Sequence, residues 1–122
     1  MNNFFLIAAF WCFMIGLIHT FAGSKYDVRP LFDSNVPEPA KSTLFYCWHI
    51  VTMTLFAMAA AFLWSGLNPE TVWPGIVATV AAGLFAVWGL FLSSMRRLSP
   101  LTKLPQGVLF LPLAGIGAWG VF

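Results

Sequence analysis

Two histidines inside apolar segments are the side chains of this chain best suited to chemistry. His19 lies near the end of the first apolar segment, in the stretch GLIHTFAG. His49 lies early in the second apolar segment, in the stretch LFYCWHIVTMT, and the chain has no other histidine. A neutral imidazole can ligate a metal ion or a haem iron, and an imidazole also exchanges protons because its unperturbed pKa is close to physiological pH. The pair therefore predicts a ligand site, a proton site or a metal site.

Polar residues accompany both histidines at helical spacing. Side chains three or four positions apart share one face of a helix, so Tyr46, Thr52 and Met53 lie on the same face as His49. The predicted ligand-binding residues are His19, His49, Thr52, Tyr46 and Thr20. A metal site would use His19 and His49 with Met53, and a haem would need only the two imidazoles. A simpler interpretation is that each imidazole hydrogen-bonds a carbonyl or a threonine and holds two helices together.

The elements that position these histidines are predicted to be membrane helices. The chain is 60% hydrophobic and 8% charged, whereas soluble domains average about 25% charged residues. Its apolar segments at about 4–21, 43–64, 72–93 and 105–122 are each near the ~20 residues that a crossing helix needs. We therefore expect an all-α, multi-pass membrane protein whose single transmembrane domain, residues 1–122, is an antiparallel four-helix bundle of two hairpins.

Charge placement predicts an orientation. All six basic residues lie in two connections, residues 22–42 and 94–104. By the positive-inside rule both connections face the cytoplasm and both termini lie outside, in a cell inner membrane. At ~1.5 Å per residue, His19 would then lie about 4 Å below the cytoplasmic boundary and His49 about 9 Å below it. If the first two helices are neighbours, the two imidazoles meet in a polar seam.

Several function classes are disfavoured by what the segments contain. No apolar segment carries Asp or Glu, no serine has an evident histidine partner, and no phosphate-binding glycine motif occurs, so the sequence argues against an enzyme. A net charge of +2 without a basic stripe argues against nucleic-acid binding. We expect a small membrane protein that binds or transports a small ligand, ion or proton at the seam.

Two alternatives stay open from the sequence. One is a haem- or metal-binding subunit for electron transfer or assembly, and the other is a structural subunit of a larger membrane complex. In each case the lipid bilayer is the surrounding partner. A homo-oligomer or a second membrane protein is also expected, because four short helices enclose little volume.

Overall fold

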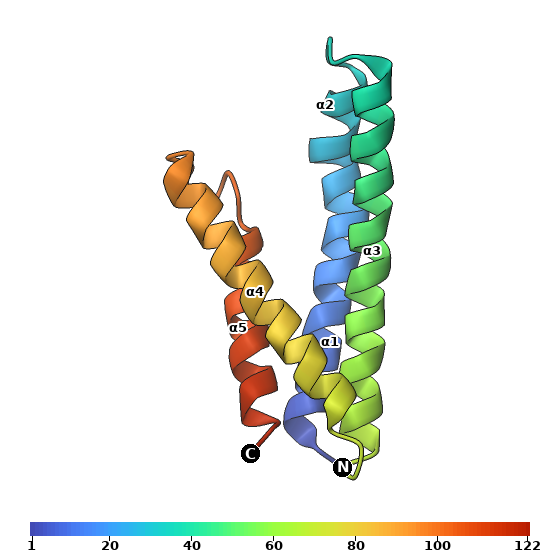
Figure 1. Cartoon of the computed structure of the whole chain (residues 1–122), viewed down its shortest axis with the longest axis vertical. Coiled ribbons are helices and arrows are strands. Elements are labelled where there is room, and N and C mark those ends of the chain that lie inside the picture. The colour runs from blue at the N-terminus through green and yellow to red at the C-terminus, as the bar shows by residue number, and fades with distance from the viewer.

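The computed structural model describes all 122 residues, and every regular element in it is helical (Figure 1). The all-helical fold predicted from the sequence is therefore confirmed. In chain order the elements are α1 (Asn3–Ile18), η1 (His19–Val28), α2 (Arg29–Phe32), α3 (Glu38–Leu67), α4 (Trp73–Met95) and α5 (Gln106–Trp119).

Three helical stretches are long and apolar enough to cross a membrane. They are Asn3–Phe32, Glu38–Leu67 and Trp73–Met95, with mean hydropathies of 2.1, 1.8 and 2.1. At 1.5 Å per residue even the shortest is about 34 Å long, which exceeds a hydrocarbon core of about 30 Å. Helix α5 has 14 residues and is only about 21 Å long. Three of the four expected segments thus form helices long enough to span a membrane, and the fourth is shorter than predicted.

The first helix continues well beyond its predicted end. Helices α1, η1 and α2 form one continuous stretch, which shortens the connection to α3 from the expected residues 22–42 to residues 33–37. Within η1 the backbone is a π-helix, and the amide of Arg29 donates to the carbonyl of Ser24 five residues earlier. The buried ammonium of Lys41 donates to the carbonyl of Phe32 at 3.0 Å and lies 3.5 Å from Glu38. Lys41 thereby satisfies a carbonyl where the first helical stretch ends.

The helices form two pairs that meet at one end and diverge toward the other. Helix α3 lies along α1 and η1, and α5 lies along α4 (Figure 1). Both chain termini and the turn of residues 68–72 lie at the end where the pairs meet, here named the closed end. The connections of residues 33–37 and 96–105 lie at the other end, named the open end.

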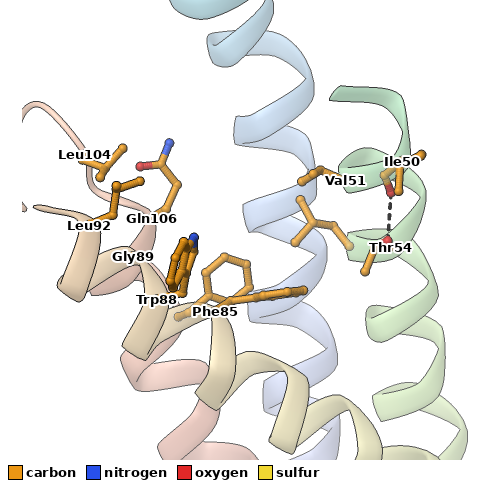
Figure 2. A pocket seen from close by; sticks show the side chains of 11 residues that line it. Ile50, Val51, Thr54, Phe85, Trp88, Gly89, Leu92, Leu104 and Gln106 are labelled. Carbon is orange, nitrogen blue, oxygen red and sulfur yellow. Dashed lines mark hydrogen bonds between the residues drawn. The ribbon is translucent and has the colours of Figure 1, made fainter. Parts of the chain in front are cut away.

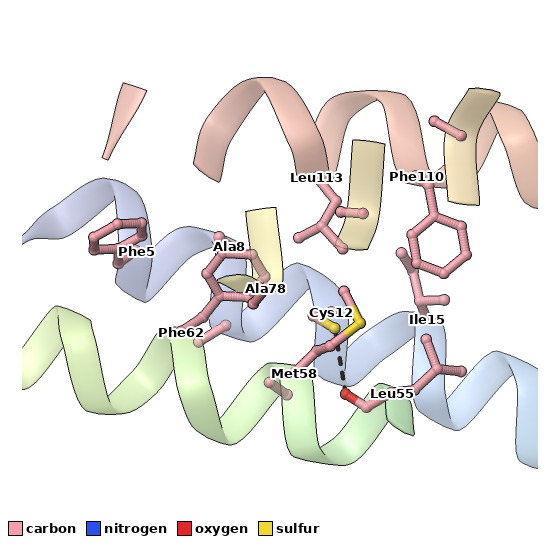
Figure 3. Close-up of a cluster of buried hydrophobic side chains, with 14 residues drawn as sticks. Phe5, Ala8, Cys12, Ile15, Leu55, Met58, Phe62, Ala78, Phe110 and Leu113 are labelled. Carbon is pink, nitrogen blue, oxygen red and sulfur yellow. Dashed lines mark hydrogen bonds between the residues drawn. The ribbon is translucent and has the colours of Figure 1, made fainter. Parts of the chain in front are cut away.

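The buried core fills the closed end and the middle of the molecule (Figure 3). Phe5 and Phe62 are fully buried there with ring centroids 6.1 Å apart. Helix α4 contributes only small core residues, Ala78, Ala82 and Ala86, and small side chains let helix backbones approach closely. The Cys12 thiol donates to the carbonyl of Leu55 at 3.3 Å, joining α1 to α3.

Two polar residues fasten the closed end. The backbone amide of Asn2 donates to Gly66 at 2.8 Å, and its side-chain amide donates to Gly120 at 2.7 Å. The hydroxyl of Ser65, itself fully buried, donates to the carbonyl of Thr71 at 2.8 Å and accepts from the amide of Gly75 at 2.9 Å. These bonds tie α1, α3, α4 and α5 together at the end away from the basic residues.

Candidate functional site

A cleft lies between the two helix pairs where they diverge. It consists of two neighbouring cavities of about 450 Å³ and about 470 Å³, which share the lining residues Val51, Leu55, Gln106 and Phe110. Cavities of this size fall in the ~300–1,000 Å³ range of small-ligand sites. We name the first cavity the apolar lobe and the second the polar lobe.

The apolar lobe is bounded by α3 on one side and by α4 and the start of α5 on the other (Figure 2). Ile50 and Val51 face Phe85 and Trp88 across it. Its lining side chains offer few polar atoms. The hydroxyl of Thr54 is already donated to the carbonyl of Ile50 at 2.8 Å, within the same helix. The lobe is therefore suited to a hydrocarbon group rather than to a polar one.

The polar lobe gathers most of the polar groups of the cleft. Its lining includes His19, Tyr26, Asp27, Thr102, Lys103 and Gln106. The first three come from η1, and the others come from the connection before α5 and from its first residue. Lys103 and Asp27 form no ion pair with each other or with any other group, since the one ion pair of the chain joins Lys41 to Glu38. Both charges remain free to interact with a ligand.

Two glycines place the start of α5 beside the cleft. Gly89 of α4 and Gly107 of α5 are buried against each other. A Cβ atom built on Gly89 would lie 2.6 Å from the backbone nitrogen of Gly107, so neither position has room for a side chain. This contact fixes Gln106, the residue before Gly107, between the two lobes.

A third glycine positions His19. A Cβ atom on Gly23 would overlap the indole of Trp48, because its distance to Cζ2 would be 2.7 Å. The missing side chain lets the Trp48 ring lie flat against η1 and stack on the His19 imidazole, with centroids 3.7 Å apart and planes inclined by 19°. The Nε2 atom of His19 also lies 3.4 Å from the carbonyl oxygen of Trp48. His19 is thus held by α3 while it lines the polar lobe.

The structure places the two histidines in different surroundings. His49 is exposed on α3 and contacts the ring of Phe45 edge-on, with centroids 4.5 Å apart. The residue of α3 that meets His19 is the preceding one, Trp48. The two imidazoles therefore do not contact each other, and of the two only His19 lines the cleft.

The remaining predicted site residues also lie outside the cleft lining. The hydroxyl of Thr20 donates to Gly16 at 2.8 Å and that of Thr52 donates to Trp48 at 3.1 Å, both within their own helices. Tyr46 and Met53 are 67% and 64% exposed. The face of α3 that carries Tyr46 and Met53 is thus turned outward, away from α1.

The two imidazoles that a metal or haem site would use do not lie together. No group of three or more His, Cys, Asp or Glu residues is close enough to hold a metal ion. A bis-histidine haem would need an Nε2 atom from each imidazole on opposite faces of one porphyrin. Here Nε2 of His19 meets the carbonyl of Trp48, and one face of its ring is covered by the indole.

Sequence reasoning missed the residues that complete the cleft. Lys103 and Gln106 were assigned to a connection and to a fourth span, and Asp27 to a long loop. The signal for Asp27 was its position eight residues after His19, about two turns further along the same face if the helix continues. No comparable signal marks Lys103, because only the short length of α5 brings it beside η1.

The chain matches no protein-family model, and neither a curated protein nor a solved structure is significantly similar to it.

Proposed function

We propose that this chain is a small integral membrane protein that binds a small ligand in the cleft between its two helix pairs. His19 provides the fixed polar group of the site in this proposal, in place of the seam of two histidines expected from the sequence. The observation that supports ligand binding is the pair of adjoining lobes. One lobe is almost wholly apolar, and the other is lined by His19, Asp27, Lys103 and Gln106.

Membrane insertion is supported by the outer surface as well as by helix length. On α4, Val77, Leu84 and Val87 are each at least 64% exposed, so the surface turned away from the core is apolar. In water such a face would be a large unprotected patch, whereas lipid accepts it at no cost. The connection of residues 96–105 carries three of the six basic residues, Lys25 and Arg29 lie in the last turns of the first helical stretch, and Lys41 lies at the start of α3. This asymmetry supports an inner-membrane orientation with the open end cytoplasmic and both termini outside.

The unequal lengths of α4 and α5 support a polar cleft within the membrane. Helix α4 exceeds α5 by nine residues, which is about 13 Å of rise. Residues 96–105 must therefore descend alongside the upper part of α4 before α5 begins. Non-helical backbone at membrane depth is tolerated where it is buried in protein or lines a hydrated cavity. The polar lobe is the cavity that this segment lines, through Thr102, Lys103 and Pro105.

The role of His19 follows from how firmly it is held. Its ring cannot turn freely, because the Trp48 indole covers one face and the Trp48 carbonyl meets Nε2. A fixed imidazole in a partly apolar site offers a hydrogen bond in a defined direction, which is how small-ligand sites orient their ligands. A homo-oligomer or a membrane-protein partner stays a prediction from the sequence.

The proposal is tested by filling the cleft. Val51 lines both lobes, so Val51→Trp should occupy their shared region. The matched control is Val77→Trp, on the outer face of α4 and outside the lining. After gentle extraction and washing in neutral detergent, we expect native mass spectrometry to find a small molecule retained at near one per chain in the natural protein and the control.

We expect Val51→Trp to lose that molecule and His19→Leu to retain less of it. Far-UV circular dichroism checks that each variant keeps its helices. Equal retention by Val51→Trp and the natural protein, or no retained molecule in either, would contradict ligand binding in the cleft.

A further inference from the structure

We infer that the cleft binds one anionic phospholipid, with an acyl chain in the apolar lobe and the phosphate beside Lys103 in the polar lobe. This inference rests on the proposed function and names its ligand class. It is carried by the division of the cleft into two lobes and by the charge distribution around its open end.

The apolar lobe has the lining that a hydrocarbon chain requires. Phe85 and Trp88 of α4 face Ile50 and Val51 of α3 across it, and Phe110 closes it toward the core (Figure 2). A polar ligand placed there would lose its hydrogen bonds to water and find almost none in return. An acyl chain loses nothing, and rigid aromatic walls supply dispersion contacts along its length.

The polar lobe continues directly from the apolar one, so one molecule can occupy both. Gln106, which lines both lobes, offers a side-chain amide at their junction. Beyond it, Lys103 provides a compact positive charge, and Thr102 provides a hydroxyl that can donate a hydrogen bond. These groups suit a phosphate and its ester oxygens, each of which accepts hydrogen bonds.

The one acid in the polar lobe is outweighed by the charges around it. Asp27 lines the polar lobe, and Asp33 lies at the end of α2, which continues the helical stretch that carries Asp27. Five basic residues at the open end form no ion pair: Lys25, Arg29, Arg96, Arg97 and Lys103. The excess of three positive charges favours anionic over zwitterionic headgroups, and lysines and arginines near a membrane surface each attract anionic lipid. The closed end has no lysine or arginine at all.

The test uses the full chain in bilayers that contain equal amounts of phosphatidylglycerol and phosphatidylcholine with identical acyl chains. Native mass spectrometry after detergent release measures the ratio of the two lipids retained per chain. We expect phosphatidylglycerol to be retained about three- to tenfold in excess, the range expected when one partly desolvated charge contact is added. Val51→Trp should abolish retention of both lipids.

A pair of charge variants locates the headgroup. Lys103→Gln removes the only basic residue that lines the cleft, and we expect it to reduce the retention ratio to near one. Arg96→Gln removes the same charge from the same connection but outside the lining, so we expect a fall of less than about twofold.

The outcomes separate the inference from the proposed function. Equal retention of the two lipids, or equal effects of Lys103→Gln and Arg96→Gln, would overturn anionic headgroup selection while a loss in Val51→Trp still supports a cleft that binds ligand. Retention unchanged by Val51→Trp would overturn both, because the lipid would then be bound elsewhere.

Discussion

Replacing Gly89 by alanine tests the packing that places α5 against α4. A Cβ atom at this position would lie 2.6 Å from the backbone nitrogen and 2.8 Å from the Cα atom of Gly107. The shorter distance is about 0.8 Å less than the 3.4 Å at which ordinary van der Waals contact begins. Because both neighbours are backbone atoms, no side-chain rotation relieves the overlap, and the two helices must separate.

The cost of Gly89→Ala can be isolated with a second glycine of the same helix. A Cβ atom on Gly83 would have no neighbour within 4 Å, so Gly83→Ala changes helix propensity alone, by up to about 1 kcal/mol in favour of alanine. The same gain in helix propensity applies at position 89. The difference in unfolding free energy between the two variants is therefore the cost of the steric overlap. Overpacking of a buried contact costs about 1–3 kcal/mol, and we expect Gly89→Ala to be less stable than Gly83→Ala by this amount.

The assay is unfolding by sodium dodecyl sulfate in mixed micelles with a neutral detergent, followed by tryptophan fluorescence. We expect the Gly89→Ala transition at a lower detergent fraction than those of the natural protein and of Gly83→Ala. A difference in unfolding free energy of less than about 0.5 kcal/mol between the two variants would refute a steric cost at Gly89, because effects at independent sites add only to within this amount.

Two further predictions concern the closed end and the orientation. Ser65→Ala removes the hydroxyl that accepts from the Gly75 amide, and a buried amide left without a partner costs about 1–3 kcal/mol of unfolding free energy. The control Thr43→Ala loses only an exposed hydrogen bond within its own helix, so it should cost less than about 0.5 kcal/mol in the same unfolding assay. In a cysteine-free background, Glu70→Cys should react with an impermeant maleimide in intact cells, while Asn35→Cys should react only after the membrane is opened; the reverse pattern would contradict a cytoplasmic open end.

The sequence was sufficient to predict the helices that are long and continuously apolar. Residues 72–93 were predicted as an apolar span and α4 covers Trp73–Met95, because that segment is almost continuously apolar and has Pro74 in its first turn, where the missing amide costs nothing. Composition likewise indicated the all-helical class. Helix ends were less predictable: the polar residues Ser24, Lys25 and Asp27 read as a loop, yet they lie on a helix that α3 supports along its length.

The candidate site was less predictable than the fold, for a geometric reason. The predicted depth of a residue follows from counting along the chain, and this count placed both histidines in the parts of the first two helices that lie toward the open end. Rotation about a helix axis does not follow from depth. A tryptophan at position 48 opposite a glycine at position 23 turns α3 so that Trp48 meets His19, and His49 then points elsewhere. The packing of Gly23 against the indole therefore decides whether Trp48 or His49 meets His19.

The turn of residues 68–72 and the bonds of Ser65 join α3 to α4 at the closed end, whereas no hydrogen bond joins the two helix pairs at the open end. Helix α4 is about 34 Å long, so a rotation of the helix by about 5° about its first turn, near Gly75, would displace its far end by about 3 Å. We therefore expect substitutions at the closed end to change the width of the cleft at the open end, although they touch no residue that lines it.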